Sequence, residues 1–341
     1  MFFAILWKNK DISLEELEFI QPQNLKQIDN FIVTFETFFP EKLNLLWGII
    51  KRWKVVDSDE FDNILWETKL LWTQDKELWI KLKKQYKIKR FKITDLFHTD
   101  KEVKEKWIEI IKIKTWLPNS SGFGIVKWYQ NISLYEAVDF DKPARDMKMW
   151  MMPSKLAHIM LNIWLNNIDW NPTIYDPLAW SGTIWFIANF FWHNVILSDI
   201  KINYLIQNLE RRQSTKLCKI NNRFETFQQD IFLPIKTQEQ NIVIVTEWWL
   251  WPIVNDNTSK DQIEKYQKQV IETYKELIQR INEIKAIKSV FTIPYYIWCH
   301  NKIEEEIQET SLKLWLKFRS IEEIYKRENQ KVWRKIIIIT I

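Results

Sequence analysis

The sequence predicts an α/β fold with a mostly parallel sheet over residues 151–341, preceded by a smaller α+β domain over residues 1–115. Two observations lead to this prediction. Beyond residue 150, short apolar runs alternate with helical stretches, and such alternation implies parallel strands joined by right-handed crossovers. Before residue 116, short apolar runs alternate with charged helical stretches, which suggests a small α+β domain. Residues 116–150 contain few long apolar runs and are expected to connect the two domains.

In the first domain, apolar alternation predicts strands at Phe2–Leu6 and Phe31–Phe38, and charged amphipathic stretches predict helices at Asp11–Phe19 and Lys101–Lys112. The segment Lys81–Lys92 contains seven basic residues and no acidic one. Such a run can neutralise nucleic-acid phosphates, and a solvated charged face explains it equally well. The candidate substrate-binding residues in this segment are Lys83, Lys84, Lys87 and Arg90.

In the second domain, helices are predicted at Ser154–Leu165, Thr183–Phe191, Lys201–Gln213 and Asp261–Ile287. Strands are predicted at Thr173–Tyr175, Val195–Leu197, Ile242–Thr246, Ser289–Ile297 and Ile336–Ile341. Ser259 and Gln262 form a capping box before the longest helix. The last two strands are expected to pair antiparallel at one edge of the sheet.

The composition departs from that of ordinary globular proteins at two residue types. The chain of 341 residues has 4 Gly and 21 Trp, whereas average usage gives roughly 24 Gly at this length. The Gly deficit is close to the Trp excess. One interpretation is a Trp-rich protein. The other, which we favour, is a UGA codon that the source organism reads as Gly and that is written here as Trp.

The positions of the Trp residues favour the second interpretation. Trp180 lies in a tight loop between a predicted strand and helix, where a ligand needs close backbone approach. Trp192 follows a predicted helix, and Trp170 lies in a turn, both positions that favour Gly. Trp47 adjoins Gly48, and Trp251 precedes a proline. With Trp at position 180, we expect weak ligand binding and overpacking.

Charge and cysteine content exclude several function classes. The net charge of +5 permits a nucleic-acid partner without requiring one. Two cysteines, Cys218 and Cys299, exclude a disulfide framework and a cysteine zinc motif, and the four His residues are scattered, so we expect no metal. The sequence has no signal-peptide pattern and no stretch long enough to span a bilayer. We therefore expect a cytoplasmic protein with no membrane partner.

The loop of the first predicted βα unit is the best candidate for a cofactor site, because the helix N-terminus can receive a polar ligand group there. Its cofactor-binding candidates are Asp176, Pro177, Ala179, Trp180, Ser181, Gly182 and Thr183. With position 180 read as Gly, the loop is D-P-L-A-G-S-G-T. It then resembles motif I, D-P-x-x-G-S-G-T, of nucleic-acid amino-methyltransferases, a resemblance that implies S-adenosylmethionine as the cofactor.

Two further acids follow predicted strands. Asp199 ends the second strand and can accept both ribose hydroxyls of a cofactor, or can cap the next helix. Asp230 follows a predicted third strand and can contact the adenine amino group, or can be a solvated loop acid.

The segment Glu247–Pro252 ends the fourth predicted strand, where amino-methyltransferases have a D-P-P-Y-like motif. By this resemblance Glu247 is the catalytic acceptor that orients an exocyclic amine, and Trp249 is the ring that stacks on a flipped-out base. The alternative for Trp249 is core packing. The segment departs from the motif, because Glu replaces Asp or Asn and the proline pair is absent.

Three segments together resemble the THUMP-associated tRNA guanine-N2-methyltransferases that modify guanosine 10. They are Asp139–Asp146, which resembles R-D-x-x-R-P-x-R-D, Trp150–Asn162, which resembles G-M-x-P-x-K-L-A-x-I-M-x-N, and Gln330–Ile336, which resembles Q-x-V-G-R-x-I. The resemblance implies a Rossmann-like class I methyltransferase domain and transfer of a methyl group to N2 of a tRNA guanine. It places Lys155 beside the cofactor site as a further substrate-binding candidate.

Two other functions remain open at this point. One is methylation of adenine N6 or guanine N2 in DNA or ribosomal RNA, because motif I does not separate these substrates. The other is an RNA-binding protein with an inactive methyltransferase fold, because the segment at 247–252 departs from the usual motif. Whether a small activator subunit takes part is also open.

Overall fold

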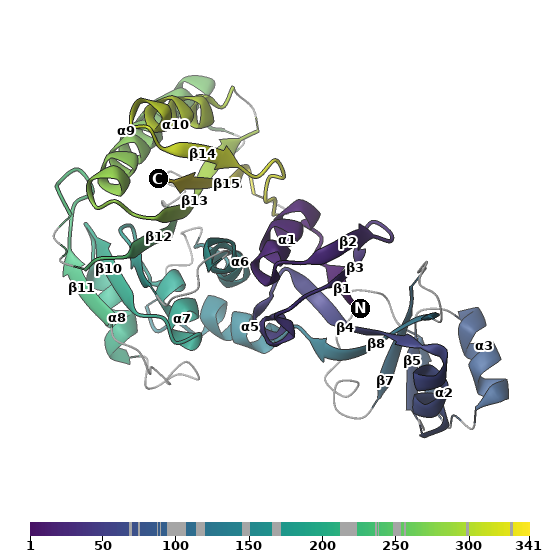
Figure 1. The fold of residues 1–341 in the computed structure, drawn as a ribbon. Helices are drawn as coiled ribbons and strands as arrows, with labels where there is room; N and C mark the ends of the chain where they lie inside the picture. The colour runs from purple at the N-terminus through teal and green to yellow at the C-terminus, as the bar shows by residue number, and fades with distance from the viewer. Residues whose placement is uncertain are drawn as a thin grey trace. The chain divides into compact units, whose positions relative to one another are not determined.

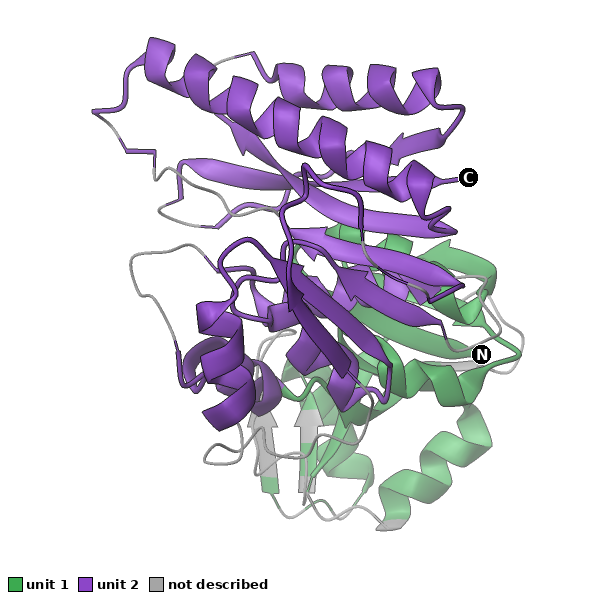
Figure 2. Cartoon of the chain, turned by 90° about the vertical axis from the view of Figure 1, so that its left-hand side faces the viewer, with its two compact units in different colours: residues 1–131 green, residues 132–341 purple. Residues whose placement is uncertain are grey.

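The computed structural model describes residues 1–67, 70–73, 76–86, 88, 90–93, 107–113, 120–144, 151–165, 172–211, 224–235, 237, 239–247, 254–255, 257–297, 300–327 and 330–341. The chain forms two compact units, unit 1 at Met1–Asn131 and unit 2 at Ile132–Ile341 (Figure 2). The boundary between them lies within the span 116–150 that the sequence suggested as a connector. That span contains a strand, β8 (Ser120–Tyr129), and a helix, α5 (Ile132–Phe140).

Unit 1 is built on an eight-stranded sheet with the order β2-β3-β1-β4-β8-β7-β5-β6 (Figure 1). Its other strands are β1 (Phe2–Leu6), β2 (Gln23–Gln27), β3 (Ile32–Glu36), β4 (Ile49–Asp57), β5 (Leu70–Thr73), β6 (Arg90–Ile93) and β7 (Ile108–Lys112). Its helical segments are α1 (Lys10–Leu17), η1 (Glu18–Ile20), η2 (Pro40–Leu45), α2 (Ser58–Glu67) and α3 (Lys76–Gln85). The expected strands at 2–6 and 31–38 and the expected helix at 11–19 are confirmed as β1, β3 and α1.

The helix expected at 101–112 is wrong over its described part, residues 107–112. Residues Ile108–Lys112 form β7, which pairs with β8 antiparallel and with β5 parallel. Ile110 and Ile111 are both buried there. A run of β-branched side chains with neighbours on both faces of a sheet favours strand over helix, whatever the charge pattern before it.

Unit 2 is built on a seven-stranded sheet with the order β11-β10-β9-β12-β13-β15-β14. Its strands are β9 (Thr173–Asp176), β10 (Val195–Asp199), β11 (Phe224–Gln228), β12 (Ile242–Glu247), β13 (Lys288–Tyr296), β14 (Lys317–Ser320) and β15 (Val332–Thr340). Its helices besides α5 are α6 (Ser154–Leu165), α7 (Thr183–Phe190), α8 (Asn203–Arg211), α9 (Lys260–Glu283) and α10 (Lys302–Lys313).

The first five strands of this sheet are parallel and follow the 3-2-1-4-5 order of doubly wound nucleotide-binding sheets. The predicted α/β, Rossmann-like fold is therefore present. Helices α9 and α10 pack on one face, where Tyr274, Leu277 and Ile281 join the core beneath them, while α6 and α7 lie together on the other (Figure 1). The order reverses between β9 and β12, and the loops at their carboxyl ends therefore border the crevice in which such folds bind ligands.

The far side of the sheet is antiparallel, as expected. Strand β15 pairs antiparallel with β13, with Thr292 opposite Ile336. The prediction that this pair forms the edge is wrong, because β14 pairs with the outer side of β15. Strand β14 is only four residues long and contains Lys317 and Arg319, so its sequence lacks an apolar strand pattern.

The long helix was predicted closely because its start is encoded locally. The Ser259 side chain accepts from the Gln262 N–H, the Gln262 side chain accepts from the Ser259 N–H, and the apolar stripe faces the core. Within the described residues, no helix is long and apolar enough to cross a membrane.

Among the residues that the structure describes, three Trp residues have left-handed backbone conformations. The φ angles are +38° at Trp180, +67° at Trp192 and +61° at Trp315. Trp192 follows α7 and Trp315 follows α10, and in both cases two backbone N–H groups bond back to the last helical turn in a Schellman motif. In that motif the residue at Trp192 or Trp315 is usually Gly. Both side chains are exposed, Trp315 at 92%, so packing does not offset the backbone strain.

We predict that W315G and W192G each stabilise the chain by about 1 kcal/mol, because Gly adopts positive φ without the Cβ penalty. Urea unfolding measures the change. K285G is the matched comparison, because Lys285 has φ +51° in the same motif after α9. Q308G, at an exposed site within α10, should instead destabilise by about 1 kcal/mol. Equal losses of unfolding free energy for W315G and Q308G would contradict the prediction.

Candidate functional site

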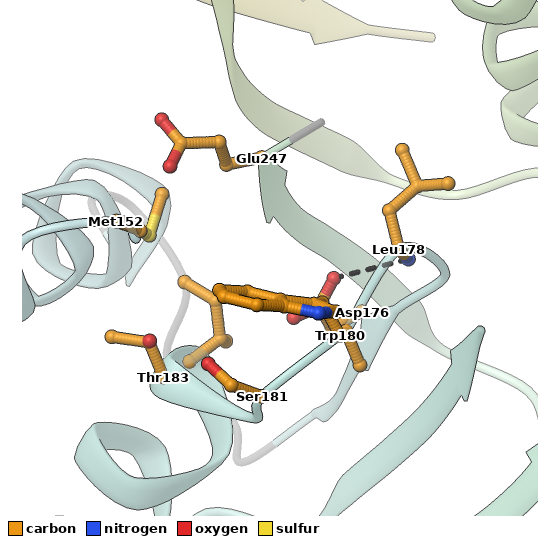
Figure 3. Close-up of a pocket in the computed structure, with 9 residues that line it drawn as sticks. Met152, Asp176, Leu178, Trp180, Ser181, Thr183 and Glu247 are labelled. Carbon is orange, nitrogen blue, oxygen red and sulfur yellow. Dashed lines mark hydrogen bonds between the residues drawn. The ribbon is translucent and has the colours of Figure 1, made fainter. Parts of the chain in front are cut away.

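A pocket opens at the carboxyl ends of β9 and β12. It is lined by Met152, Asp176, Leu178, Ala179, Trp180, Ser181, Thr183, Ile184 and Glu247 (Figure 3). The pocket therefore lies at the reversal of strand order, where the topology places a ligand.

Backbone hydrogen bonds hold the loop between β9 and α7 in place. The Ala179 N–H donates to the carbonyl of Ser198 at 3.0 Å, and the Trp180 N–H donates to Oδ2 of Asp199 at 2.9 Å. The Gly182 N–H then closes a turn on the Ala179 carbonyl at 2.7 Å. The end of β10 thus fixes the loop that forms the pocket floor.

Helix α7 starts at this loop with its positive end toward the pocket. Gly182 precedes it with φ +78°, and a Cβ there would lie 2.8 Å from a methyl group of Leu205. Both the backbone conformation and the lack of space require Gly at this position. Trp180, two residues earlier, has a positive φ without being Gly.

The indole of Trp180 lies in the middle of the pocket residues, beside Asp176 and Ser181 (Figure 3). Its ring centroid is 5.8 Å from that of Tyr204. The side chain therefore fills space at the point where the loop would otherwise bring its backbone against a ligand.

Asp176 lies on the floor of the pocket and is 3% exposed. Burial raises the pKa of its carboxyl group to about 7, and the nearby charges of Asp199 and Glu247 add to this shift. Hydrogen bonds from Thr246 Oγ1 at 2.6 Å and from the Leu178 N–H at 3.3 Å oppose it. Asp176 is thus an acid whose charge a cationic ligand would stabilise.

Asp199 also has a raised pKa, because burial disfavours its charge, while backbone N–H groups of Lys201 and Trp180 oppose the shift. Its Oδ1 accepts from the Lys201 N–H at 2.7 Å and its Oδ2 from Trp180. These bonds show that Asp199 organises two loops. Each carboxylate oxygen has two lone pairs. After these two bonds, each oxygen of Asp199 can therefore still accept a hydrogen bond from a ribose hydroxyl, as expected from the sequence.

Glu247 lies at the end of β12 and faces the pocket. Its Oε1 accepts from Thr292 Oγ1 at 2.7 Å and from Nε of Arg334 at 2.6 Å. The Arg334 side chain is fully buried, and the Glu247 side chain is 7% exposed. The expected acceptor residue is therefore held in a buried ion pair.

The structure thus brings six of the predicted site residues together around one pocket, namely Asp176, Ala179, Trp180, Ser181, Thr183 and Glu247. Pro177 and Gly182 belong to the same loop, and Asp199 supports it. Asp230 follows β11, where its Oδ1 accepts from the Phe232 N–H in a turn. Lys155 lies in the first turn of α6. Trp249 lies outside the described residues, as do Lys87 and Trp170.

The basic candidates belong to unit 1. Lys83 and Lys84 are exposed on α3, and Lys83 Nζ lies 5.0 Å from the ring centroid of Trp79. Arg90 is exposed at the start of β6.

Sequence reasoning missed Lys142 among the residues near the site. Lys142 is buried, and its Nζ donates to Thr183 Oγ1 at 2.6 Å and to Ser181 Oγ at 3.3 Å. It lies in the segment 139–146, which was singled out only for its resemblance. The residues beside Lys142 in the sequence do not indicate its partners, because Ser181 and Thr183 lie about 40 positions further along the chain.

Among the described residues, no group of three or more His, Cys, Asp or Glu side chains is placed to hold a metal ion. The described lining residues of the pocket offer carboxylates and hydroxyls beside the positive end of α7.

No protein-family model and no curated protein matches the chain. Solved structures with a similar backbone include TrmN from Thermus thermophilus, at 11% identity and a TM-score of 0.49, covering 99% of this chain and 98% of that one. A SAM-dependent methyltransferase from Methanosarcina mazei covers 52% of this chain and 96% of its own, at 12% identity and a TM-score of 0.38. Magnesium protoporphyrin IX methyltransferase from Synechocystis, with bound SAM, covers 61% and 93%, at 10% identity and a TM-score of 0.37. These similarities concern the course of the backbone and do not identify an activity.

We predict that Asp176 makes the stability of the fold depend on pH. Its folded pKa of about 7 lies above the ordinary value of 3.8, so the folded state holds the proton more tightly between these values. Stability should therefore fall as pH rises from about 4 to 7, by up to about 1.4 kcal/mol per pH unit for one proton.

Urea unfolding of the parent and of D176N at pH 5, 6, 7 and 8 tests this prediction. The Asn variant keeps a carbonyl oxygen that can accept from Thr246 and carries no charge. Its stability relative to the parent should rise with pH up to about 7 and then level off. Parallel pH curves for the two chains would show that Asp176 does not titrate in this range.

Proposed function

We propose that the protein is an S-adenosylmethionine-dependent methyltransferase that modifies an exocyclic amine of a nucleic acid, and we infer that N2 of a tRNA guanine is the target. The observation that supports this most directly is the pocket at the strand reversal. It combines the positive end of α7 with the carboxylates of Asp176 and Glu247. The sequence of its loop has the spacing of motif I.

The charge of the pocket favours this cofactor over a nucleotide phosphate. Asp176 and Glu247 are acidic, and no Lys or Arg is among the described lining residues. The cations behind the lining, Lys142 and Arg334, are already bonded to the Ser181 and Thr183 hydroxyls and to Glu247. A diphosphate or triphosphate would bring negative charge against these acids. S-adenosylmethionine has a sulfonium and an ammonium group, so its positive charges would stabilise ionised Asp176.

The residues of the chain supply binding and orientation. Asp176 would hold the cationic part of the cofactor, and the loop at 179–183 would contact its polar groups through backbone and hydroxyls. Glu247 would accept a hydrogen bond from the substrate amine and align its lone pair. When bound, S-adenosylmethionine would supply an electrophilic methyl group, so that transfer would break its C–S bond, form an N–C bond and release one amine proton to water.

The nucleic-acid partner is inferred from the basic run on unit 1 and from the three segments that resemble the tRNA guanine-N2 enzymes. Methylation of DNA or ribosomal RNA is the second candidate, because the pocket does not distinguish these substrates. We further propose that Trp180, Trp192 and Trp315 are Gly in the native protein. Positive φ at all three supports this proposal, and peptide mass spectrometry of the native protein tests it.

We predict that W180G binds S-adenosylmethionine at least tenfold more tightly than the printed chain, because it removes the indole from the pocket and keeps the N–H that donates to Asp199. Isothermal titration measures both dissociation constants. W192G is the matched control, since it relieves the same backbone strain at the other end of α7. Its affinity should equal that of the parent. Tight binding of S-adenosylmethionine by the parent chain with Trp180, or no binding by W180G, would contradict the proposed cofactor site.

A methylation assay identifies the substrate. The W180G protein is incubated with radiolabelled cofactor and with separate pools of tRNA, ribosomal RNA and DNA, and the label in each pool is counted. We expect label in tRNA. Labelling confined to DNA would contradict tRNA as the substrate, while the proposed methyltransferase activity would still be supported. Cofactor binding without label in any pool would favour the inactive RNA-binding alternative.

We predict that K83Q/K84Q weakens tRNA binding without changing cofactor affinity, because both charges lie on the exposed side of α3. Loss of two phosphate contacts should reduce the slope of log affinity against log salt by about 1.5. K265Q/K268Q removes two exposed charges from α9 and serves as the control. An equal effect of both pairs would contradict a specific role for α3.

A further inference from the structure

The guanidinium of Arg334 joins three segments that are distant in the sequence. It donates to Glu247 through Nε at 2.6 Å, to the carbonyl of Met151 through Nη2 at 3.3 Å, and to Gln330 Oε1 through Nη1 at 3.3 Å. Glu247 ends β12 beside the pocket, and Met151 precedes α6 and adjoins the lining residue Met152. Arg334 is fully buried, so these contacts are shielded from solvent.

The sheet order explains why this residue reaches the pocket. Strand β13 lies between β12 and β15, with Glu247 opposite Thr292 and Thr292 opposite Ile336. Because side chains two residues apart share a face of a strand, Arg334 lies on the same face as Ile336 and Thr292. The antiparallel direction of β15 brings its early residues to the end of the sheet where β12 and β13 have their carboxyl ends.

The hydrogen bonds of Glu247 distinguish its two oxygens. Oε1 accepts from Arg334 Nε and from Thr292 Oγ1, which uses both of its lone pairs. Among the described residues, Oε2 has only a contact of 3.4 Å from Arg334 Nη2. Oε2 is therefore the oxygen with acceptor capacity left for a ligand in the pocket.

We propose that Arg334 is a positioning residue that holds Glu247 by Oε1 and thereby directs Oε2 to accept the hydrogen bond from the substrate amine. This inference rests on the proposed function. With Oε1 occupied by Arg334 Nε and Thr292 Oγ1, Oε2 is the oxygen that can meet an amine donor in the pocket. Loss of Arg334 therefore removes the contact that determines which oxygen of Glu247 faces the substrate.

Steady-state kinetics in the full-length chain with W180G test this role, using unfractionated tRNA and radiolabelled S-adenosylmethionine. We expect R334M to lower kcat about 100-fold, the scale at which misplacement of a reacting group acts. The dissociation constant of S-adenosylmethionine should stay within threefold. R334K, which restores a cation without the planar fork, should recover part of kcat. In a protein that already carries E247Q, adding R334M should lower kcat little further, because no carboxylate is left to position.

K335M is the matched control. Lys335 is the next residue of β15 and contacts both oxygens of Glu304 at 2.8 and 2.6 Å, an ion pair whose members do not line the pocket. Its loss should lower the urea midpoint and leave kcat within twofold.

A folded R334M protein with unchanged kcat would overturn the role of Arg334 alone. The same holds if the double variant lowers kcat by the product of the factors found for E247Q and R334M separately. A W180G parent that methylates no nucleic acid would overturn the proposed function and this inference together. A shared loss with R334M and E247Q, with cofactor affinity retained, would support the role.

Discussion

The pocket of unit 2 is built around the hydrogen bond from the backbone N–H of residue 180 to the carboxylate of Asp199. Together with the bond from the Ala179 N–H to the Ser198 carbonyl, this bond ties the loop after β9 to the end of β10, ahead of the turn at Gly182 that precedes α7. It requires a backbone path that side chains with a Cβ adopt only with strain. The residue at position 180 therefore has to satisfy a bond through its backbone while its side chain stays out of the pocket, and Trp satisfies only the first of these demands.

The same topology concentrates negative charge. Parallel strands end together, so Asp176, Asp199 and Glu247 meet at one edge of the sheet in a partly buried environment. The three acids differ in their hydrogen-bond partners. Asp199 is held by two backbone N–H groups, Glu247 by a buried arginine, and Asp176 by one hydroxyl and one N–H, with its pKa raised to about 7. Asp176 is thus the acid of the three whose charge depends most on what enters the pocket.

Local signals allowed much of unit 2 to be predicted. The capping box of α9, the apolar stripe of that helix and the acids at the strand ends are all readable within a few residues. The same reasoning failed at β7, where charges before residue 108 suggested a helix and the tertiary partners β5 and β8 favour a strand. It could not find the pairing of Glu247 with Arg334, because the two residues are joined through β13 and not through neighbouring sequence. Trp315 was also missed, because its significance depends on α10, which the sequence did not reveal.

The insertion of β15 between β13 and β14 also bears on the order of events during synthesis. Glu247, Thr292 and Arg334 emerge from the ribosome in that order, and β14 emerges before the strand that separates it from β13. Until residue 334 is available, β13 has an unpaired edge and Glu247 has no buried cation, so a nascent chain has a nearly complete sheet beside an unfinished pocket. Glu247 can therefore pair with Arg334 only after β15 has been translated, and until then the edge of β13 is open to pairing with other strands.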